Sequence, residues 1–223
     1  MWYYEKRLQF PVKINRTCPK TASLIISQFG GPDGELAASM RYLSQRYTMP
    51  CREAAGLLTD IGTEELAHLE MICAIIYQLT KNLTPEQAKT AGFDAYYIDH
   101  TSALWPAAAG GIPFNACEFQ SKGDALTDLH ENLSAEQKAR TTYDNLIRII
   151  PDADVREPLK FLRAREIVHY QRFGEALEKI KERLDARNFY YYNPEFDKQM
   201  IPSLSSVGIS IVRTFLLLRI LWF

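Results

Sequence analysis

With 223 residues, 47% of them hydrophobic, the chain is long enough to bury one large core, so we expect one domain, with or without a tail, rather than two small ones. Its 26 basic and 27 acidic residues nearly balance, which gives no field for attracting a polyanion, and we expect no nucleic-acid partner. The four cysteines are scattered and too few for a disulfide framework.

The first 18 residues are rich in aromatic side chains and lack a helical period. They predict an extended arm, residues 1–18, that lies on the body or on a neighbouring subunit and carries no chemistry. The stretch from Met1 to Arg7 has charges where a secretory signal needs a continuous apolar segment. We therefore expect an intracellular protein that is not secreted by a signal peptide.

A helical pattern follows, and the Gly-Gly-Pro-Asp-Gly stretch 30–34 interrupts it. Glycine and proline together break or kink a helix, so we predict two helices, roughly 19–29 and 33–47. Glu35 and Tyr42 share a face of the second one. Because Glu35 lies close to the interruption, it is either a core-facing ligand or an acidic residue of the first helical turn, where acids are favoured.

The next predicted helix covers about 53–80, and two polar residues, Glu65 and His68, interrupt its apolar stripe. A carboxylate and an imidazole three residues apart lie on one side of a helix and can bind one ion from the same direction. A buried, unpaired glutamate is costly, so something should compensate its charge. The full stripe consists of Leu58, Ile61, Glu65, His68, Ile72, Ile76 and Leu79.

Residues 82–122 contain several glycines and prolines and predict a long connection with at most one short helix, near 85–91. A connection of this length is unusual in a compact domain and tends to be functional.

Two more helices, about 123–150 and 154–186, close the predicted bundle, and the short loop between them makes them antiparallel neighbours. The first carries Glu136 within an apolar row. The second repeats the earlier interruption, because Glu166 and His169 fall in its apolar stripe with the same spacing and order.

The end of the chain, residues 201–223, is an apolar tail to which we assign no role. Its last 17 residues are strongly apolar but include Arg213 and Arg219. A membrane span needs ~20 apolar residues with few charges, so we expect no membrane association and favour burial of this tail against a partner.

Four long helices with one long crossover in the middle predict an all-α, ferritin-like four-helix bundle over residues 19–200, preceded by the extended arm. Two of these helices each offer one glutamate, and the other two each offer a Glu-x-x-His pair, which is the ligand pattern of two-metal carboxylate bundles. Carboxylate-rich ligands suit manganese and iron alike, so spacing alone leaves the metal open and makes Glu166 a ligand.

Three stretches, residues 30–36, 59–71 and 161–169, resemble the manganese catalases, and in particular the short spore-coat branch of that family. The resemblance extends over about residues 1–197. It implies a centre with two manganese ions, in which Glu65 bridges both. The residues that it implies as metal ligands are Glu35, Glu65, His68, Glu136 and His169.

The same resemblance implies different roles for two further residues. It moves Glu166 from the ligands to a neighbouring position, where it forms hydrogen bonds and handles protons, and it matches Tyr42 to a tyrosine that hydrogen-bonds the first-helix carboxylate, here Glu35. Catalases of known activity carry an arginine that narrows the approach to the metals, and Ala135 stands at that position here.

The resemblance implies an enzyme that converts hydrogen peroxide to water and oxygen. It also implies a place in the bacterial spore coat among other coat proteins, and a hexamer-like homo-oligomer. Two alternatives remain open. One is a structural coat-assembly protein that has a metal site but little activity, and the other is a di-iron oxidase, which would use Glu166 as a true ligand.

Overall fold

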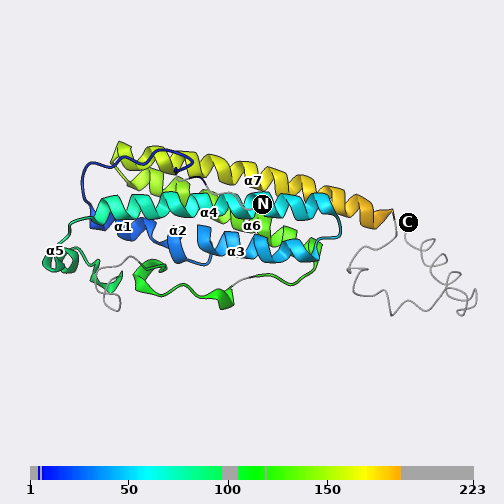
Figure 1. Cartoon of the computed structure of the whole chain (residues 1–223), viewed down its shortest axis with the longest axis horizontal. Coiled ribbons are helices and arrows are strands. Elements are labelled where there is room, and N and C mark those ends of the chain that lie inside the picture. The colour runs from blue at the N-terminus through cyan, green and yellow to red at the C-terminus, as the bar shows by residue number, and fades with distance from the viewer. Residues whose placement is uncertain (1–4, 6, 97–104, 119, 187–223) are drawn as a thin grey trace, which may run out of the picture. The chain divides into compact units, whose positions relative to one another are not determined.

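The computed structural model describes residue 5 and residues 7–96, 105–118 and 120–186. The regular secondary structure of this part is helical, apart from one isolated bridge between Ala107 and Pro113 (Figure 1). The chain divides into two compact units, Met1–Glu182 and Arg183–Phe223, and the first contains the bundle. The predicted tail lies outside the described residues, and the predicted domain limits at 18 and 200 stay predictions.

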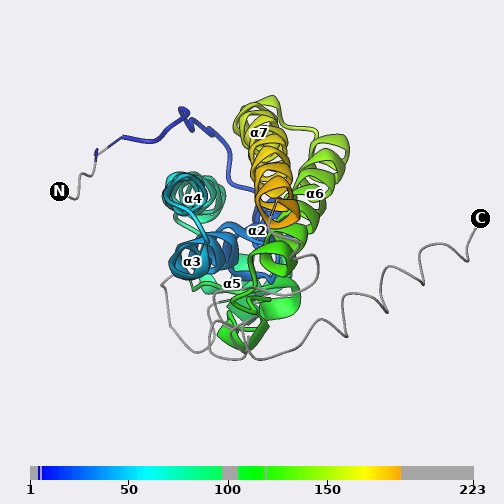
Figure 2. The ribbon, with the colours of Figure 1, turned by 90° about the vertical axis from the view of Figure 1, so that its right-hand side faces the viewer.

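Four helical segments lie around a common axis in the first unit, as Figure 2 shows nearly end-on. Three short helices in succession form the first segment, and α4, α6 and α7 form the others, so the predicted bundle with one long crossover is confirmed. The helices are α1 (Pro19–Ile25), α2 (Ser27–Gly30), α3 (Glu35–Gln45), α4 (Arg52–Thr80), α5 (Pro85–Thr90), α6 (Ala125–Ile149) and α7 (Ala153–Asp185).

The interruption between α2 and α3 ends later than predicted, because the helix expected from residue 33 begins at Glu35, after Gly34 as its N-cap. A Cβ atom at Gly30 would lie 2.5 Å from the backbone nitrogen of Ala107, so the glycine lets the long crossover pack directly on this segment. Glu35 therefore satisfies both expectations: it begins the first turn of α3, and its side chain is buried.

The crossover between α4 and α6 is more ordered than predicted. Besides α5 it contains three single-turn 3₁₀ helices within its described part, at Asp94–Tyr96, Ala109–Gly111 and Ala116–Glu118, so the expectation of at most one short helix was wrong. Two consecutive glycines with positive φ, Gly110 and Gly111, allow the tight turn at the second of them.

Apolar side chains fill the bundle toward the end where α4 leads into the crossover. Ile72, Ile76 and Leu79 of α4 pack with Leu146 of α6 and Leu159 of α7, each less than 5% exposed. We call these five residues the apolar layer. Burial of apolar area at about 25 cal/mol per Å² makes such a layer a main source of stability.

The N-terminal arm lies on the body. Gln78 of α4 accepts a hydrogen bond from the backbone nitrogen of Ile14 at 2.7 Å and donates one to the carbonyl of Val12 at 3.0 Å. Phe10 stacks on Phe161 of α7 with 5.1 Å between ring centroids. The arm therefore contacts both α4 and α7, the two helices that carry the Glu-x-x-His pairs.

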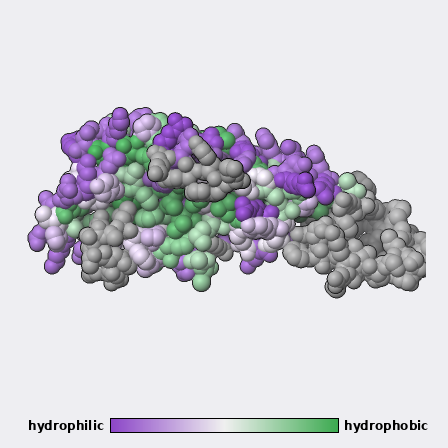
Figure 3. All heavy atoms as spheres, viewed as in Figure 1, coloured by the Kyte–Doolittle hydropathy of each residue, from purple (hydrophilic) through white to green (hydrophobic). Residues whose placement is uncertain are grey.

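One face of the molecule exposes apolar side chains in quantity. Figure 3 shows them gathered in the middle of the face along which α4 and α3 run in Figure 1. Large exposed hydrophobic residues on these two helices include Met40, Leu66 and Tyr77. Of the helices in the described residues, none combines the length and the hydropathy needed to cross a membrane.

Candidate metal centre

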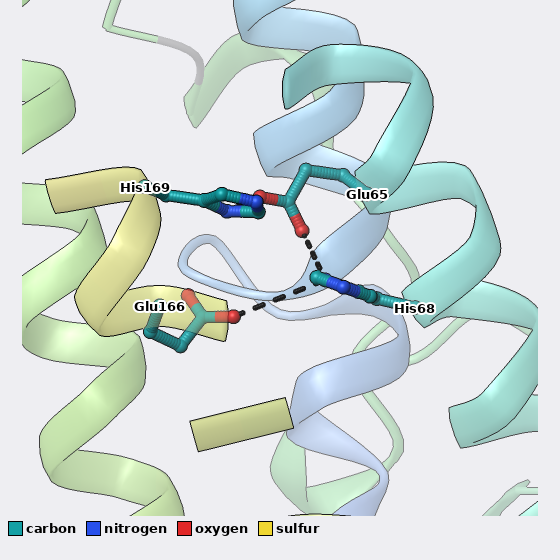
Figure 4. Close-up of side chains that lie close together, drawn as sticks. All are labelled: Glu65, His68, Glu166 and His169. Atoms are coloured by element: carbon teal, nitrogen blue, oxygen red, sulfur yellow. Dashed lines mark hydrogen bonds and ion pairs between the residues drawn. The ribbon is translucent and has the colours of Figure 1, made fainter. Parts of the chain in front are cut away.

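Glu65 is the middle of a buried polar cluster between α4 and α7. Its Oε2 lies 2.8 Å from Nδ1 of His68, one turn further along α4, and its Oε1 lies 2.7 Å from Nδ1 of His169 on α7. The two imidazole rings lie 20° from parallel with centroids 5.5 Å apart, and all three side chains are fully buried (Figure 4). One carboxylate thus joins both histidines, as a bridging ligand would.

Glu35 and Glu136 each approach one of these histidines from the remaining helices. Oε2 of Glu35, on α3, lies 3.6 Å from Nδ1 of His68, and Oε2 of Glu136, on α6, lies 3.6 Å from Nδ1 of His169. Both side chains are at most 3% exposed. The fold therefore brings together all five residues that were expected to bind metal.

Glu166 belongs to the same cluster. Its Oε1 lies 3.9 Å from Nδ1 of His68 (Figure 4). Ligand atoms of Glu65, His68, Glu166 and His169 all lie within 4.8 Å of one another. The geometry thus keeps Glu166 within reach of a metal ion, as its spacing alone suggested, and its placement among the proton-handling residues stays a prediction.

Each of the two buried tyrosines of the site forms a hydrogen bond with a glutamate on the other's helix. Tyr42 of α3 donates its hydroxyl hydrogen to Oε1 of Glu136 on α6, and Tyr143 of α6 donates to Oε1 of Glu35 on α3. The partner expected for Tyr42, Glu35, was therefore wrong. In both helices the tyrosine follows the glutamate by seven residues, and because α3 and α6 run antiparallel at this point, each hydroxyl reaches the opposite helix.

Glu64 is the site residue that the sequence interpretation missed. Its Oε1 lies 3.6 Å from Nε2 of His68 and its Oε2 lies 3.2 Å from Nε2 of His169, so it touches both rings on the side away from Glu65. Arg165 donates two hydrogen bonds to it, at 2.6 and 3.0 Å, and Gln9 donates a third at 2.8 Å. Although partial burial opposes the shift, hydrogen bonds from His169, His68 and Arg165 hold the pKa of Glu64 well below its usual range.

A repeated spacing would have found Tyr143. Four pairs of site residues are separated by the same 101 positions: Glu35 and Glu136, Tyr42 and Tyr143, Glu65 and Glu166, and His68 and His169. Glu64 has no such signal, because the equivalent position holds Arg165. Glu64 is also 16% exposed and lies outside the apolar stripe.

Buried carboxylates crowd the site and disturb its protonation. Burial, together with the charge of Glu65, raises the pKa of Glu35 to about 7, and burial with the charge of Glu35 raises the pKa of Glu166. Burial disfavours the charged form of His68 and His169, but the nearby charge of Glu65 outweighs it and raises the pKa of both. Without bound cations, the cluster contains more carboxylates than positively charged groups to neutralise them, so some of the carboxyl groups keep their protons.

The donor set fits two divalent cations. A buried oxygen of Glu136 and one of Glu166 make no hydrogen bond. Buried polar atoms without partners are rare in folded proteins and call for an explanation such as a bound ion. The four carboxylates of Glu35, Glu65, Glu136 and Glu166 carry a charge equal and opposite to that of two divalent ions, and two imidazoles complete a ligand set suited to manganese or iron.

Comparisons with known proteins agree with this geometry. A family model described as manganese containing catalase matches residues 1–202. The chain is 54% identical over 190 residues to Protein CotJC of Bacillus subtilis (strain 168), covering 85% of this chain and 100% of that protein. It is 35% identical over 193 residues to a probable manganese catalase of Clostridium acetobutylicum, covering 85% of each.

A solved structure gives the same answer. The crystal structure of wild-type KatB, a manganese catalase from Anabaena, superposes with a TM-score of 0.74 at 32% identity and covers 81% of each chain. The resemblance first noticed in three short stretches is therefore confirmed over most of the chain.

Proposed function

The chain belongs to the manganese-containing catalase family, and we propose that it converts two molecules of hydrogen peroxide to two of water and one of oxygen at the Glu65 centre. The observation that carries this proposal is the buried set of four carboxylates and two imidazoles joined through Glu65, with unpaired oxygens directed into the cluster.

In the proposed site, Glu65 would hold both metal ions, with His68 and Glu35 on one and His169 and Glu136 on the other. This division follows the contacts, because Glu35 approaches His68 and Glu136 approaches His169. Two bound manganese ions would supply the two electrons that one peroxide takes up and accept the two that the other releases.

The chain's own acids would handle the protons. One peroxide takes up two electrons and two protons to become two waters, and the other releases two electrons and two protons to become oxygen. Glu166 is suited to hold such a proton, because burial and its acidic neighbours raise its pKa and its carboxylate lies 3.9 Å from His68. Tyr42 and Tyr143 keep Glu136 and Glu35 in place through their hydroxyl groups.

We propose that the protein acts in the spore coat as a homo-oligomer, hexamer-like as in the family, and in contact with other coat proteins. Similarity to Protein CotJC over that protein's whole length supports the location. The exposed apolar side chains on α3 and α4 support assembly, because contiguous apolar surface often marks an interface.

Two other functions have a specific observation behind them. A coat-structure role with little turnover is favoured by Ala135, a small buried residue beside Glu136 that leaves the approach to the centre without an arginine. A di-iron oxidase is favoured by the position of Glu166 within reach of the proposed ions.

One preparation separates these functions: metal content by mass spectrometry together with oxygen measured electrochemically after addition of peroxide. Two manganese ions per chain with oxygen release support the proposal, and metal without oxygen release supports the coat-structure role. Iron with oxygen uptake points to the oxidase.

A pair of matched variants tests the site. Glu65→Gln keeps the shape of the side chain but removes the bridging charge, so metal content and oxygen release should both be lost. Glu178→Gln makes the same change at an exposed position of α7 and should leave both unchanged. Full metal content in Glu65→Gln would refute the assignment.

A further inference from the structure

Glu64 is tied to three separate parts of the molecule. It contacts Nε2 of both histidines, it accepts two hydrogen bonds from Arg165 on α7, and it accepts one from Gln9 on the N-terminal arm. The arm was expected to carry no chemistry. Instead, one of its side chains reaches a carboxylate that touches both imidazoles of the centre.

The orientation of the two imidazoles depends on Glu64. A carboxylate accepts hydrogen bonds and donates none, so its place beside Nε2 favours a hydrogen on that nitrogen and leaves Nδ1 as the nitrogen that would bind a metal ion. A histidine that binds a metal through one ring nitrogen usually donates the other to a carboxylate or carbonyl, which fixes the ring. Here one carboxylate is hydrogen-bonded to Nε2 of His169 at 3.2 Å and lies 3.6 Å from Nε2 of His68, so it faces both rings.

Glu64 itself needs to be held, because it is partly open to water. It lies in the wall of a groove between the arm and α4, which Leu8, Gln9 and Val12 line on the arm side. Arg165 fixes it from α7, and Gln9 closes the third direction across the groove. Without the docked arm, water would take the place of Gln9, and Arg165 would be the remaining side chain that holds Glu64 against the two histidines.

We propose that the N-terminal arm is a positioning element of the metal centre: Gln9, together with Arg165, holds Glu64 against both histidines, so that docking of the arm and binding of metal strengthen each other. This inference rests on the proposed metal centre. Coupling of this kind is reciprocal, since whatever the docked arm adds to metal affinity, bound metal adds to docking of the arm.

The first experiment measures manganese affinity of the full chain by competition with a chelating dye. Gln9→Ala should weaken it by about fivefold, and Glu64→Gln by roughly 10- to 100-fold. Asn15→Ala is the matched control, because Asn15 joins the arm to Asp154 at 3.0 Å without touching Glu64, and it should change affinity by less than about twofold. Gln9→Lys restores a donor and should recover the affinity.

The second experiment measures the coupling from the other side, by hydrogen exchange of the arm with and without manganese. The amide of Ile14, which donates to Gln78, should exchange about fivefold more slowly in the loaded protein, and this gain should disappear in Gln9→Ala. The electron paramagnetic resonance spectrum of bound manganese should change in Glu64→Gln and Gln9→Ala but not in Asn15→Ala, because it reports ligand orientation.

Equal loss of affinity in Gln9→Ala and Asn15→Ala would overturn the proposal, since the arm would then act only as a general brace. Unchanged affinity in Gln9→Ala, or arm exchange that is independent of manganese, would also overturn it. If the native chain binds no manganese, the metal centre and this inference fail together. If it binds manganese but releases no oxygen, only the proposed activity fails, and the affinity measurements still decide the role of the arm.

Discussion

Two neighbouring parts of α4 are equally buried but opposite in chemistry. Glu65 and His68 are fully buried, and so are Ile72 and Ile76 of the apolar layer, one to three turns further along the helix. The apolar side chains are stabilising wherever they are removed from water. The buried carboxylate is stabilising only when a positive charge accompanies it.

The difference shows that successive turns of one helix, α4, can serve different ends: one turn supplies polar residues of the metal centre, and the next turns supply the apolar layer that stabilises the fold. The apolar layer needs nothing from outside the chain. The metal centre, with buried oxygens of Glu136 and Glu166 that make no hydrogen bond, costs folding energy until cations fill it. Perturbing each region separately, with and without metal, should therefore give different signatures.

Metal loading should give the largest effect. Manganese at 1,000 times its dissociation constant should stabilise the native protein by about 4 kcal/mol and raise the melting temperature by about 10 °C, because only the folded chain presents the site. Removal of metal by a chelator should reverse this shift. The measurement is a thermal melt followed by circular dichroism. A shift of the same size in Glu65→Gln would show that the stabilising ions bind elsewhere.

The apolar layer should respond independently of metal. Ile76→Ala removes a fully buried side chain and should lower the free energy of unfolding by about 3 kcal/mol in both metal-free and loaded protein. Leu24→Ala, at an exposed position of α1, should cost less than about 0.5 kcal/mol. Denaturant titrations give both values. The comparison breaks down if Ile76→Ala also removes the stabilisation by manganese.

The pH dependence should separate the loaded and metal-free forms. The folded metal-free protein has Glu35 with a pKa raised from 4.5 to about 7, and Glu166 and both histidines are raised as well. A raised pKa means that the folded state holds protons that the unfolded state has lost, so stability falls as pH rises from about 4.5 through 7 and beyond.

Manganese replaces these protons, and loading should therefore release protons and become more favourable with rising pH. Unfolding titrations between pH 5 and 8 check the first trend, and calorimetry in buffers of different ionisation enthalpy checks the second. Metal-free stability that is flat over this range would contradict the inference that the site holds excess protons. Glu35→Gln, which cannot titrate, should flatten part of the slope.

The two buried tyrosines of the site should give the smallest effect. Tyr42→Phe and Tyr143→Phe each remove one buried hydrogen bond to a carboxylate and should each lower stability by about 1 kcal/mol. A double-mutant cycle in the metal-free protein should couple Tyr42 to Glu136 and leave it nearly additive with Glu35. The opposite result would restore the pairing that the family resemblance implied.

The helices and the burial of the glutamates and histidines in one cluster were predictable, because both depend on spacing within one helix. A polar residue in an apolar stripe is visible from local periodicity, and Glu65, His68, Glu166 and His169 all interrupt such stripes. The start of α3 at Glu35 was less predictable, because Gly34 lies against the backbone of α2, where an added Cβ would be 2.7 Å from the carbonyl oxygen of Ser27.

The contacts between helices were not predictable in the same way. The partner of Tyr42 depends on the antiparallel packing of α3 and α6, which no spacing within α3 contains. Glu64 was missed because it lies outside the apolar stripe and in sequence looks like any solvated side chain, and its contact with Gln9 joins residues 55 positions apart.

Glu64 and Arg165 occupy equivalent positions in the two halves of the bundle, 101 residues apart like the four matching pairs of the site, yet they carry opposite charges and bind each other. Two identical helical hairpins could supply the matching glutamates, histidines and tyrosines. They could not supply this ion pair, because both equivalent positions would then carry the same residue and the same charge. A single chain that contains both halves can let them diverge. The ion pair at this position thus distinguishes the two halves of an otherwise symmetric centre. The half with α4 supplies the carboxylate that faces both histidines, and the half with α7 supplies the arginine that holds it.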